Sequence, residues 1–278
     1  VFFFFFAYAV DAAGNKSVHS EYCVILDSAN FYLDAASADE SADGSKTHPY
    51  VSFGQCLDTI NKGRFARIRA KGIIKMPEGE TSLLSNCMLL GTGETRILLS
   101  PSSCISVKSA SFEISGCIIE KGAPVPGSGY AGYVIKLAHS VLTMNNCELA
   151  CVFGKNGTAI NADDSVINIT AGSIAVSADN YAVSISADNS KTTIKDCLIA
   201  SSADTAVNFS VHGGTFELRG TQCKAGGRMG RNGELFCAKT RMTGNTFTSE
   251  FQKTASAAVY SDDKTVFLEN KDNDLRGY

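Results

Sequence analysis

Acidic and imidazole side chains recur at a nearly constant interval in the middle of the chain. They are His139, Asp164, Asp188 and His212, at steps of 25, 24 and 24 residues, with Asn161 and Asp163 just before the second. Carboxylates beside an imidazole can act as a general acid, a general base and a substrate contact. We therefore take three of these residues as candidate catalytic groups, namely Asp164, Asp188 and His212. The candidate ligand contacts are His139, Asn161 and Asp163.

A structural role competes with the catalytic one for the same residues. Ser, Asp, Asn and His are common in tight turns, where their side chains bond to nearby backbone groups. If these residues end strands and begin turns, they need no substrate to explain them. The spacing favours this structural role and leaves the catalytic one open.

The interval is set by an apolar phrase that returns between Phe112 and Phe247. Its copies are FEISGCII, LTMNNCEL, INITAGSI, TTIKDCLI, FELRGTQC and TRMTGNTF, each preceded by a second short apolar run such as VIKL or AVSI. Large apolar residues alternate within a copy, which is typical of a strand with one buried face, and Gly, Asn or Asp interrupts the alternation. The LxxLxL core of leucine-rich repeats is absent. The pattern predicts an all-β fold, a single-stranded right-handed parallel β-helix.

Equivalent residues of successive copies form columns in such a fold. One apolar column is Ile114, Met144, Ile169, Ile194, Leu218 and Met242. Stacked strands lie about 4.8 Å apart, so each member packs between the members above and below it. A single coil cannot bury its apolar face alone, and neighbouring coils therefore stabilise one another.

Five of the ten cysteines follow the same repeat. Four of them fall on one predicted column, and a fifth, Cys223, falls on the apolar column beside it. The four are Cys87, Cys117, Cys147 and Cys197. No CxxC pair is present and no His stands at metal-ligand spacing, which favours buried thiols over metal ligands. One or two disulfides are the alternative, so the cysteines do not settle the compartment.

Charge and hydropathy limit the classes of partner. The net charge of −3 gives no reason to expect a nucleic acid. No apolar run approaches the roughly 20 residues of a membrane span, so we expect none in this chain.

Residues 1–27 lie outside the repeat and predict two strands around a turn at Asp11–Ser17. The phrase AYAVDAAGNKS resembles the last hairpin of a bacterial fibronectin type III or similar immunoglobulin-like module, of which these residues would be a C-terminal remnant. Alternatively, VFFFFF is the apolar region of a signal peptide with a cleavage site at Ala7–Ala9. Both interpretations imply an extracellular or cell-surface protein.

Residues 28–278 are predicted to form the β-helix domain. Its parts are a capping strand and helix (28–62) and the coils (64–278). Phe53, Leu57 and Ile60 recur at helical spacing behind Ser52, which is a suitable N-cap. A short amphipathic helix is expected at this point because the open end of a solenoid exposes its core and its strand edges.

The opening of this domain, from Tyr32 to Ile60, resembles that of pectin-lyase-like β-helix domains (YVDxxxGxDxxDGSxxxPYxxIxxAL). The resemblance implies the fold and no particular activity, because lyases, hydrolases and proteins of no known chemistry share this opening. Within it, Asp39 and Asp43 mimic the first half of a calcium loop, with Tyr50 where a bidentate Glu is wanted. Calcium at these two residues is one prediction, and a structural Asp-Gly turn is the other.

Two loops are expected to protrude from the coils, Lys121–Gly132 and Lys224–Gly233. The second carries Arg228 and Arg231 on a Gly-rich backbone. These two side chains could bind an acidic sugar or belong to an ordinary solvated loop.

The polar positions show a partial resemblance to polygalacturonase-type hydrolases, which carry NxD, DD, GHG and RxK on successive coils. The matching residues are Asn161, Asp163 and Asp164, then Asp188 alone, then His212 with Gly213. No RxK follows. A pectate lyase needs several Asp around calcium and an Arg base, for which Arg219 and Arg241 are candidates. The phrases GTAINADD and DTAVNF faintly resemble repeats of bacterial surface adhesins.

These half-matched patterns favour a noncatalytic extracellular β-helix module of a larger bacterial surface protein. We expect it to be monomeric and to bind a polysaccharide, a cell-surface glycan or a neighbouring surface protein, without a cofactor other than the possible calcium. The alternative is a polysaccharide lyase or glycoside hydrolase that uses the Asp and His residues. A third possibility is a purely architectural stalk, which would carry no pocket or aromatic platform.

Overall fold

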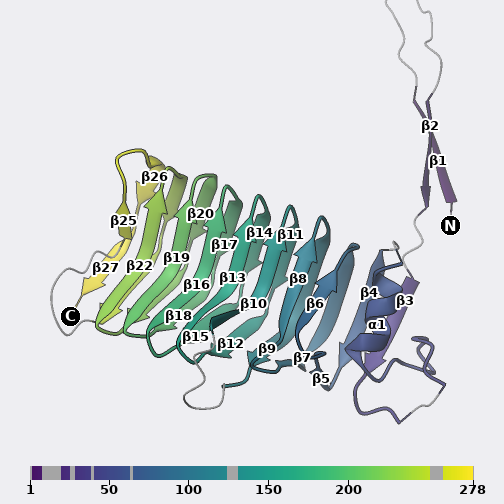
Figure 1. Cartoon of the computed structure of the whole chain (residues 1–278). Helices are drawn as coiled ribbons and strands as arrows, with labels where there is room; N and C mark the ends of the chain where they lie inside the picture. Colours follow the sequence, from purple (N-terminus) through teal and green to yellow (C-terminus); the bar gives the residue numbers. More distant parts are fainter. Residues whose placement is uncertain are drawn as a thin grey trace, which may run out of the picture.

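The computed structural model describes residues 2–7, 20–25, 29–38, 41–62, 65–123, 131–250 and 259–277. From β3 (Ala29–Asp34) onward the chain forms a right-handed parallel β-helix whose coils stack along one axis (Figure 1). The all-β fold predicted from the repeat is confirmed.

Each coil of the β-helix contains three strands and three corners. In one coil these are β13 (Asn156–Asp163), corner 1 (164–165), β14 (Val166–Thr170), corner 2 (171–172), β15 (Ser173–Ser177) and corner 3 (178–180). Each strand pairs in parallel with its equivalents one coil before and one coil after. The apolar phrase of the sequence therefore forms two strands with corner 2 between them, where Gly, Asn or Asp interrupts the alternation.

The strands form three parallel sheets. Sheet 1 contains β6 (Glu80–Leu83), β8 (Cys104–Lys108), β10 (Ala131–Ala138), β13, β16 (Tyr181–Asp188), β19 (Thr205–His212), β22 (Met229–Phe236) and β25 (Val259–Ser261). Sheet 2 contains β3, β4 (Ala66–Lys71), β11 (Val141–Asn145), β14, β17 (Lys191–Lys195), β20 (Thr215–Arg219), β23 (Lys239–Thr243) and β26 (Val266–Lys271). Sheet 3 contains β5 (Ile73–Lys75), β12 (Glu148–Val152), β15, β18 (Leu198–Ser202), β21 (Gln222–Gly226), β24 (Thr246–Glu250) and β27 (Asp274–Gly277). The long strands β7 (Cys87–Leu99) and β9 (Ser111–Lys121) run through both sheets 2 and 3.

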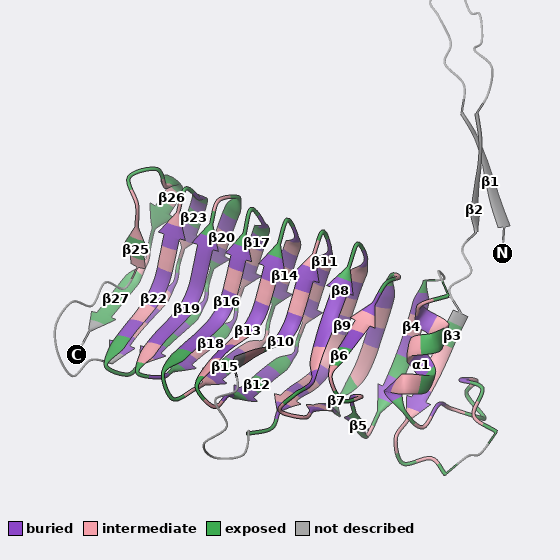
Figure 2. Ribbon diagram, viewed as in Figure 1, coloured by how far each residue is buried: buried purple, intermediate pink, exposed green. Residues whose placement is uncertain are grey.

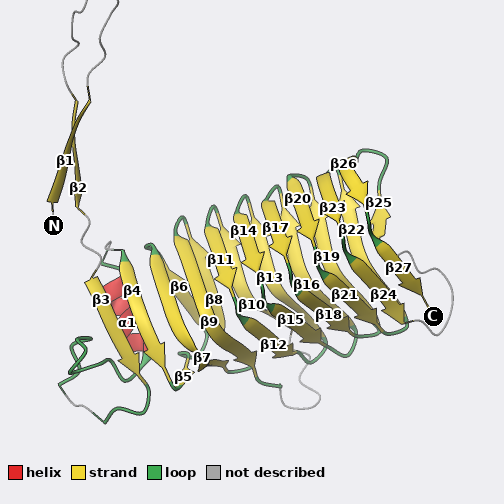
Figure 3. Ribbon diagram, turned by 180° about the vertical axis from the view of Figure 1, so that it is seen from behind, coloured by secondary structure: helices red, strands yellow, loops and turns green. Residues whose placement is uncertain are grey.

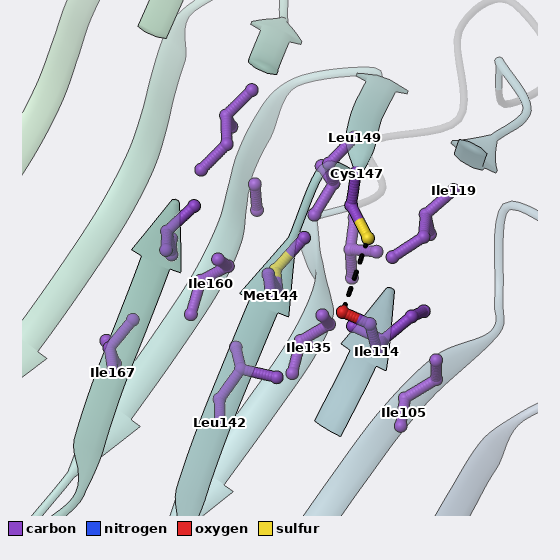
Figure 4. Close-up of a cluster of buried hydrophobic side chains, with 14 of the residues drawn as sticks. Ile105, Ile114, Ile119, Ile135, Leu142, Met144, Cys147, Leu149, Ile160 and Ile167 are labelled. Atoms are coloured by element: carbon purple, nitrogen blue, oxygen red, sulfur yellow. Dashed lines mark hydrogen bonds between the residues drawn. The ribbon is translucent and has the colours of Figure 1, made fainter. Parts of the chain in front are cut away.

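The interior is filled by the apolar columns that the repeat predicts. Met144, Ile169 and Ile194 are direct neighbours across sheet 2, and all three are buried. Figure 4 shows how Ile114 and Met144 meet side chains from the other sheets in the centre of the coil. Burial is continuous along the inner faces of the strands, whereas each corner has both buried and exposed residues and much of the last coil is exposed (Figure 2).

The helix α1 (Phe53–Ile60) covers the N-terminal end of this core. Ser52 and Gln55 form a capping box, in which the Ser52 hydroxyl accepts from the Gln55 N–H and the Gln55 side chain accepts from the Ser52 N–H. Phe53 and Ile60 are buried, and the helix packs beside β3 and β4 (Figure 3). The predicted capping helix and its N-cap are thus confirmed.

The segment before β3 forms a hairpin of two strands. β1 (Phe2–Ala7) pairs antiparallel with β2 (Ser20–Ile25), with Phe2 opposite Ile25. The expected turn at 11–17 lies outside the described residues. The assignment of the hairpin to a fibronectin-like remnant or to a signal peptide stays a prediction.

The structure corrects two predictions, one of strand register and one of a protruding loop. Cys87 pairs with Phe112 and not with Cys117, because β7 bulges between Leu90 and Thr95 and the extra residues shift the ladder. The Thr95 hydroxyl holds this bulge by donating to the Ala70 carbonyl at 2.9 Å.

The second correction concerns the expected loop Lys224–Gly233. Its first residues belong to β21 and its last to β22, so only a short turn at 227–228 joins two strands of adjacent sheets. Gly227 adopts a φ of +136° there, with the backbone of Ala203 close beneath it. Of the other expected loop, the central residues 124–130 lie outside the described part of the chain.

Candidate ligand-binding face

The polar column predicted from the sequence is split between two neighbouring columns. In sheet 1, Asp163 pairs with Asp188, and Asp188 pairs with His212. His139 and Asp164 lie one position further on, in corner 1. The prediction that Asp164, Asp188 and His212 share a column is therefore wrong, because this coil has 25 residues and places Asp188 beside Asp163 rather than beside Asp164.

Corner 1 gives His139 and Asp164 a structural setting. Both adopt left-handed backbone conformations, with φ of +50° and +44°, and Asn189 and Gly213 follow them in the next coils. Their side chains are exposed, and the His139 Nδ1 atom lies 3.9 Å from the Asp164 Oδ2 atom. This is the turn role that competed with catalysis for these residues.

A serine ladder explains why polar residues gather at this corner. The Ser165 hydroxyl donates to the Asp163 carbonyl at 2.6 Å and accepts from the Ser140 N–H at 3.0 Å. The Ser165 N–H in turn donates to the Ser190 hydroxyl at 2.9 Å. Sequence reasoning missed this ladder, although serines 25 residues apart were its signal.

The outer column of sheet 1 changes from acidic to aromatic along the helix axis. It begins with Lys108, which pairs with Glu80, and continues through Ala138, Asp163, Asp188, His212 and Phe236. The imidazole of His212 stacks on the Phe236 ring, with centroids 4.7 Å apart and planes 25° apart. Phe236 in turn contacts Tyr260, whose ring centroid lies 5.7 Å away. Sequence reasoning missed Phe236 and Tyr260, although Phe236 lies 24 residues after His212.

Polar side chains flank this aromatic stack. Asn161 is half-buried in the neighbouring column, which runs on through Ser186 and Ser210 to Glu234. The Ser210 hydroxyl lies 3.3 Å from His212 Nε2, close enough for a hydrogen bond that orients the imidazole.

The two predicted arginines occupy different places. Arg231 belongs to β22 and pairs with Glu234 at 2.7 Å, while its guanidinium lies over the Tyr260 ring at 5.8 Å. It therefore borders the aromatic end of the outer column. Arg228 lies at corner 3, where it pairs with Asp204 at 3.0 Å.

In the loop proposed for calcium, Asp43 has a structural role in a turn. The Asp43 carboxylate accepts from the Ser45 N–H at 2.8 Å, and hydrogen bonds from Ser45 lower the pKa of Asp43. Asp39 lies outside the described residues. Within the part of the chain that is described, no cluster of three or more His, Cys, Asp or Glu side chains could hold a metal.

Seven of the nine cysteines whose side chains are described are buried, and the exceptions are Cys104 and Cys237. Cys117, Cys147 and Cys197 lie in one column at corner 2, with Gly172 between the last two, and the Cys147 thiol donates to the Asn145 carbonyl at 3.3 Å. Further along the column Thr221 makes the equivalent bond with its hydroxyl. Burial raises the pKa of Cys151 to about 12. None of the nine cysteines whose side chains are described forms a disulfide.

A groove lies on sheet 3, away from the outer column. Its volume is about 830 Å³, and its floor is a stripe of Ala150, Ala175 and Ala200. Glu120 and Lys224 lie at its rim. Ligand sites orient their ligands through convergent polar groups, and the outer column offers more of these than the alanine floor does. We therefore take the outer column, together with Tyr260, as the candidate binding site.

Comparison with known proteins leaves the site to be interpreted from its geometry. No protein-family model matches the chain, and no curated protein matches it. Among the described residues, no helix is long and apolar enough to cross a membrane.

Proposed function

We propose that this chain is a noncatalytic β-helix module that binds glycans along the outer face of sheet 1. The observation that carries the proposal is the stack of His212, Phe236 and Tyr260 beside the carboxylates of Asp163 and Asp188. Sugar rings pack their C–H faces on aromatic rings and offer hydroxyl groups to carboxylates, so this combination suits a carbohydrate. Tyr260 is 46% exposed and lies at the outer surface.

The setting we propose is a multidomain bacterial surface protein outside the cytoplasm. The phrase AYAVDAAGNKS and the hairpin of β1 and β2 support a fibronectin-like module before the β-helix. The opening motif, together with the parallel β-helix, supports a relation to the pectin-lyase-like superfamily. A monomer would expose the long face of a solenoid to a glycan or to a neighbouring surface protein.

The alternative is a polysaccharide lyase or glycoside hydrolase, and one observation favours it. Asp163 and Asp188 are ladder neighbours, so their backbones lie about 4.8 Å apart, and His212 follows in the next coil. Retaining glycosidases hold two carboxyl groups about 5 Å apart. Such a pair is catalytic, however, when different surroundings make one carboxyl group an acid and the other a base. Asp163 and Asp188 are both exposed and occupy equivalent positions in the sheet. We therefore favour binding over turnover.

The test is a glycan array followed by calorimetric titration of the whole chain. The Phe236→Ala, Tyr260→Ala double variant is expected to lose binding, and Phe267→Ala, which removes an exposed ring from sheet 2, is expected to keep it. Equal loss in both would contradict a site on sheet 1. Polysaccharide turnover that Asp188→Ala abolishes would establish the enzyme instead, and silence in both assays would favour an architectural stalk.

A further inference from the structure

The aromatic stack of the outer column stops abruptly at His212. Phe236, one coil further on, covers one face of the imidazole. The opposite face is turned toward the preceding coil, where the column continues with Asp188 and then Asp163. Aspartate is much shorter than an aromatic side chain. The column therefore has a step, with a ring face as its wall and two carboxylates as its floor.

The carboxylates of this floor are available to a ligand. Asp163 and Asp188 are exposed, and neither forms an ion pair with any side chain that the structure describes. Other acidic groups of the same sheet are already paired. Glu80 contacts Lys108 at 2.8 Å, and Glu234 contacts Arg231 at 2.7 Å. The two carboxylates of the step therefore have no Lys or Arg partner among the described residues.

We infer that this step is a subsite for a protonated amino sugar. The C–H face of the sugar ring continues the aromatic stack on His212, and its ammonium group donates to the carboxylates of Asp188 and Asp163. The inference rests on the proposed glycan-binding function and names the class of sugar.

The charge of the floor discriminates among sugars. A uronic acid brings a carboxylate against two carboxylates and is repelled. A neutral or N-acetylated sugar donates hydrogen bonds to these carboxylates without bringing an opposite charge, whereas an ammonium group adds the attraction between opposite charges to the same hydrogen bonds. The preference for a free amine therefore comes from the two aspartates, and the stacking contact is common to all these sugars.

The direction of the column also suits a polymer. The floor residues repeat once per coil, at about 4.8 Å along the helix axis. This interval is close to the length of one sugar unit in an extended chain, so an oligomer bound along the axis passes over both aspartates.

The test uses the whole chain and three soluble tetramers in parallel titrations. They are β-1,4-linked glucosamine, its N-acetylated form and galacturonate. The glucosamine tetramer is expected to bind tightest. Asp188→Asn keeps the shape and removes the charge, so it is expected to weaken glucosamine binding about tenfold or more and to leave the N-acetylated tetramer nearly unchanged.

Asp196→Asn is the matched control, because Asp196 is an exposed aspartate at corner 2 whose left-handed backbone suits Asn. If this control weakens glucosamine binding as much as Asp188→Asn does, the attraction is general and the subsite is overturned. Equal binding of the amine and N-acetylated tetramers would overturn the inference and leave the proposed function standing. If none of the tetramers and no glycan on the array binds, the proposed function itself fails.

Discussion

Two columns of the β-helix have the same geometry and opposite rules of composition. The inner column that contains Ile169 is apolar in each coil from Ile114 to Met242, whereas the outer column passes from Ala138 through two aspartates to His212 and Phe236. Neighbours in both are one strand apart. Burial restricts the inner position to side chains that pack without polar groups, and solvent leaves the outer position free to vary. The outer column can therefore carry recognition at little cost to stability.

The largest expected effect comes from breaking the inner column. Ile169→Asp places a carboxylate between Met144 and Ile194, where Ile169 is only 2% exposed. An unpaired buried charge costs several kcal/mol, and because each coil depends on its neighbours the loss is expected to spread through the middle of the solenoid. Urea unfolding followed by far-ultraviolet circular dichroism measures the change in the free energy of unfolding.

The matched control for this variant is Ile169→Val, which removes one methylene group and is expected to cost about 1 kcal/mol. Comparable losses for the Asp and Val variants would mean that position 169 is not in the core.

A polar exception inside the solenoid offers the next largest effect. Asn208 is buried in an inner column, where it accepts from the Ser201 hydroxyl at 2.7 Å and donates to Asn232 Oδ1 at 2.7 Å. Asn208→Leu fits the apolar rule but leaves the Asn232 oxygen without its donor. We expect a loss of about 1–3 kcal/mol by urea unfolding.

Ser186→Ala, at a half-buried position on the outer side of the same sheet, serves as the control and is expected to change little. A more stable Asn208→Leu protein would show that the polar network contributes nothing to the fold.

The contrast between the inner and outer columns also explains how much of the structure could be predicted from the sequence. Burial makes the inner column repeat one residue type, so the register of Ile169 and the strands around it could be recognised. The outer face lacks such a signal. Asp is tolerated both at the end of the strand and in the corner. The sequence spacing therefore looked regular even though it assigned Asp164 instead of Asp163 to the column of Asp188. Tyr260 was missed because its ring does not recur at the same position in other coils.

A smaller effect, and a gain, is expected from completing the apolar rule. The Thr192 hydroxyl is buried without a hydrogen-bond partner, in the column between Ile167 and Phe216. Thr192→Val has nearly the same shape and removes this unpaired group, which should raise the free energy of unfolding by about 1 kcal/mol. Thr193→Val, next in the strand and partly exposed, is the control with no expected gain. A less stable Thr192→Val protein would mean that the hydroxyl has a partner in solution.

The smallest effect on stability is expected at the outer column itself. The Asp188 side chain is exposed, and the corner beside it is held by the Ser190 hydroxyl, which donates to the Asp188 backbone carbonyl at 2.7 Å. That bond does not involve the carboxylate. Asp188→Ala should therefore keep the free energy of unfolding within about 0.5 kcal/mol of the parent.

Ser190→Ala removes the hydroxyl from the ladder and is expected to cost more in the same urea experiment. If Asp188→Ala were as damaging as Ile169→Asp, the two faces of the strand would be inverted. Near-native stability together with weakened glucosamine binding would instead separate recognition from folding at a single residue.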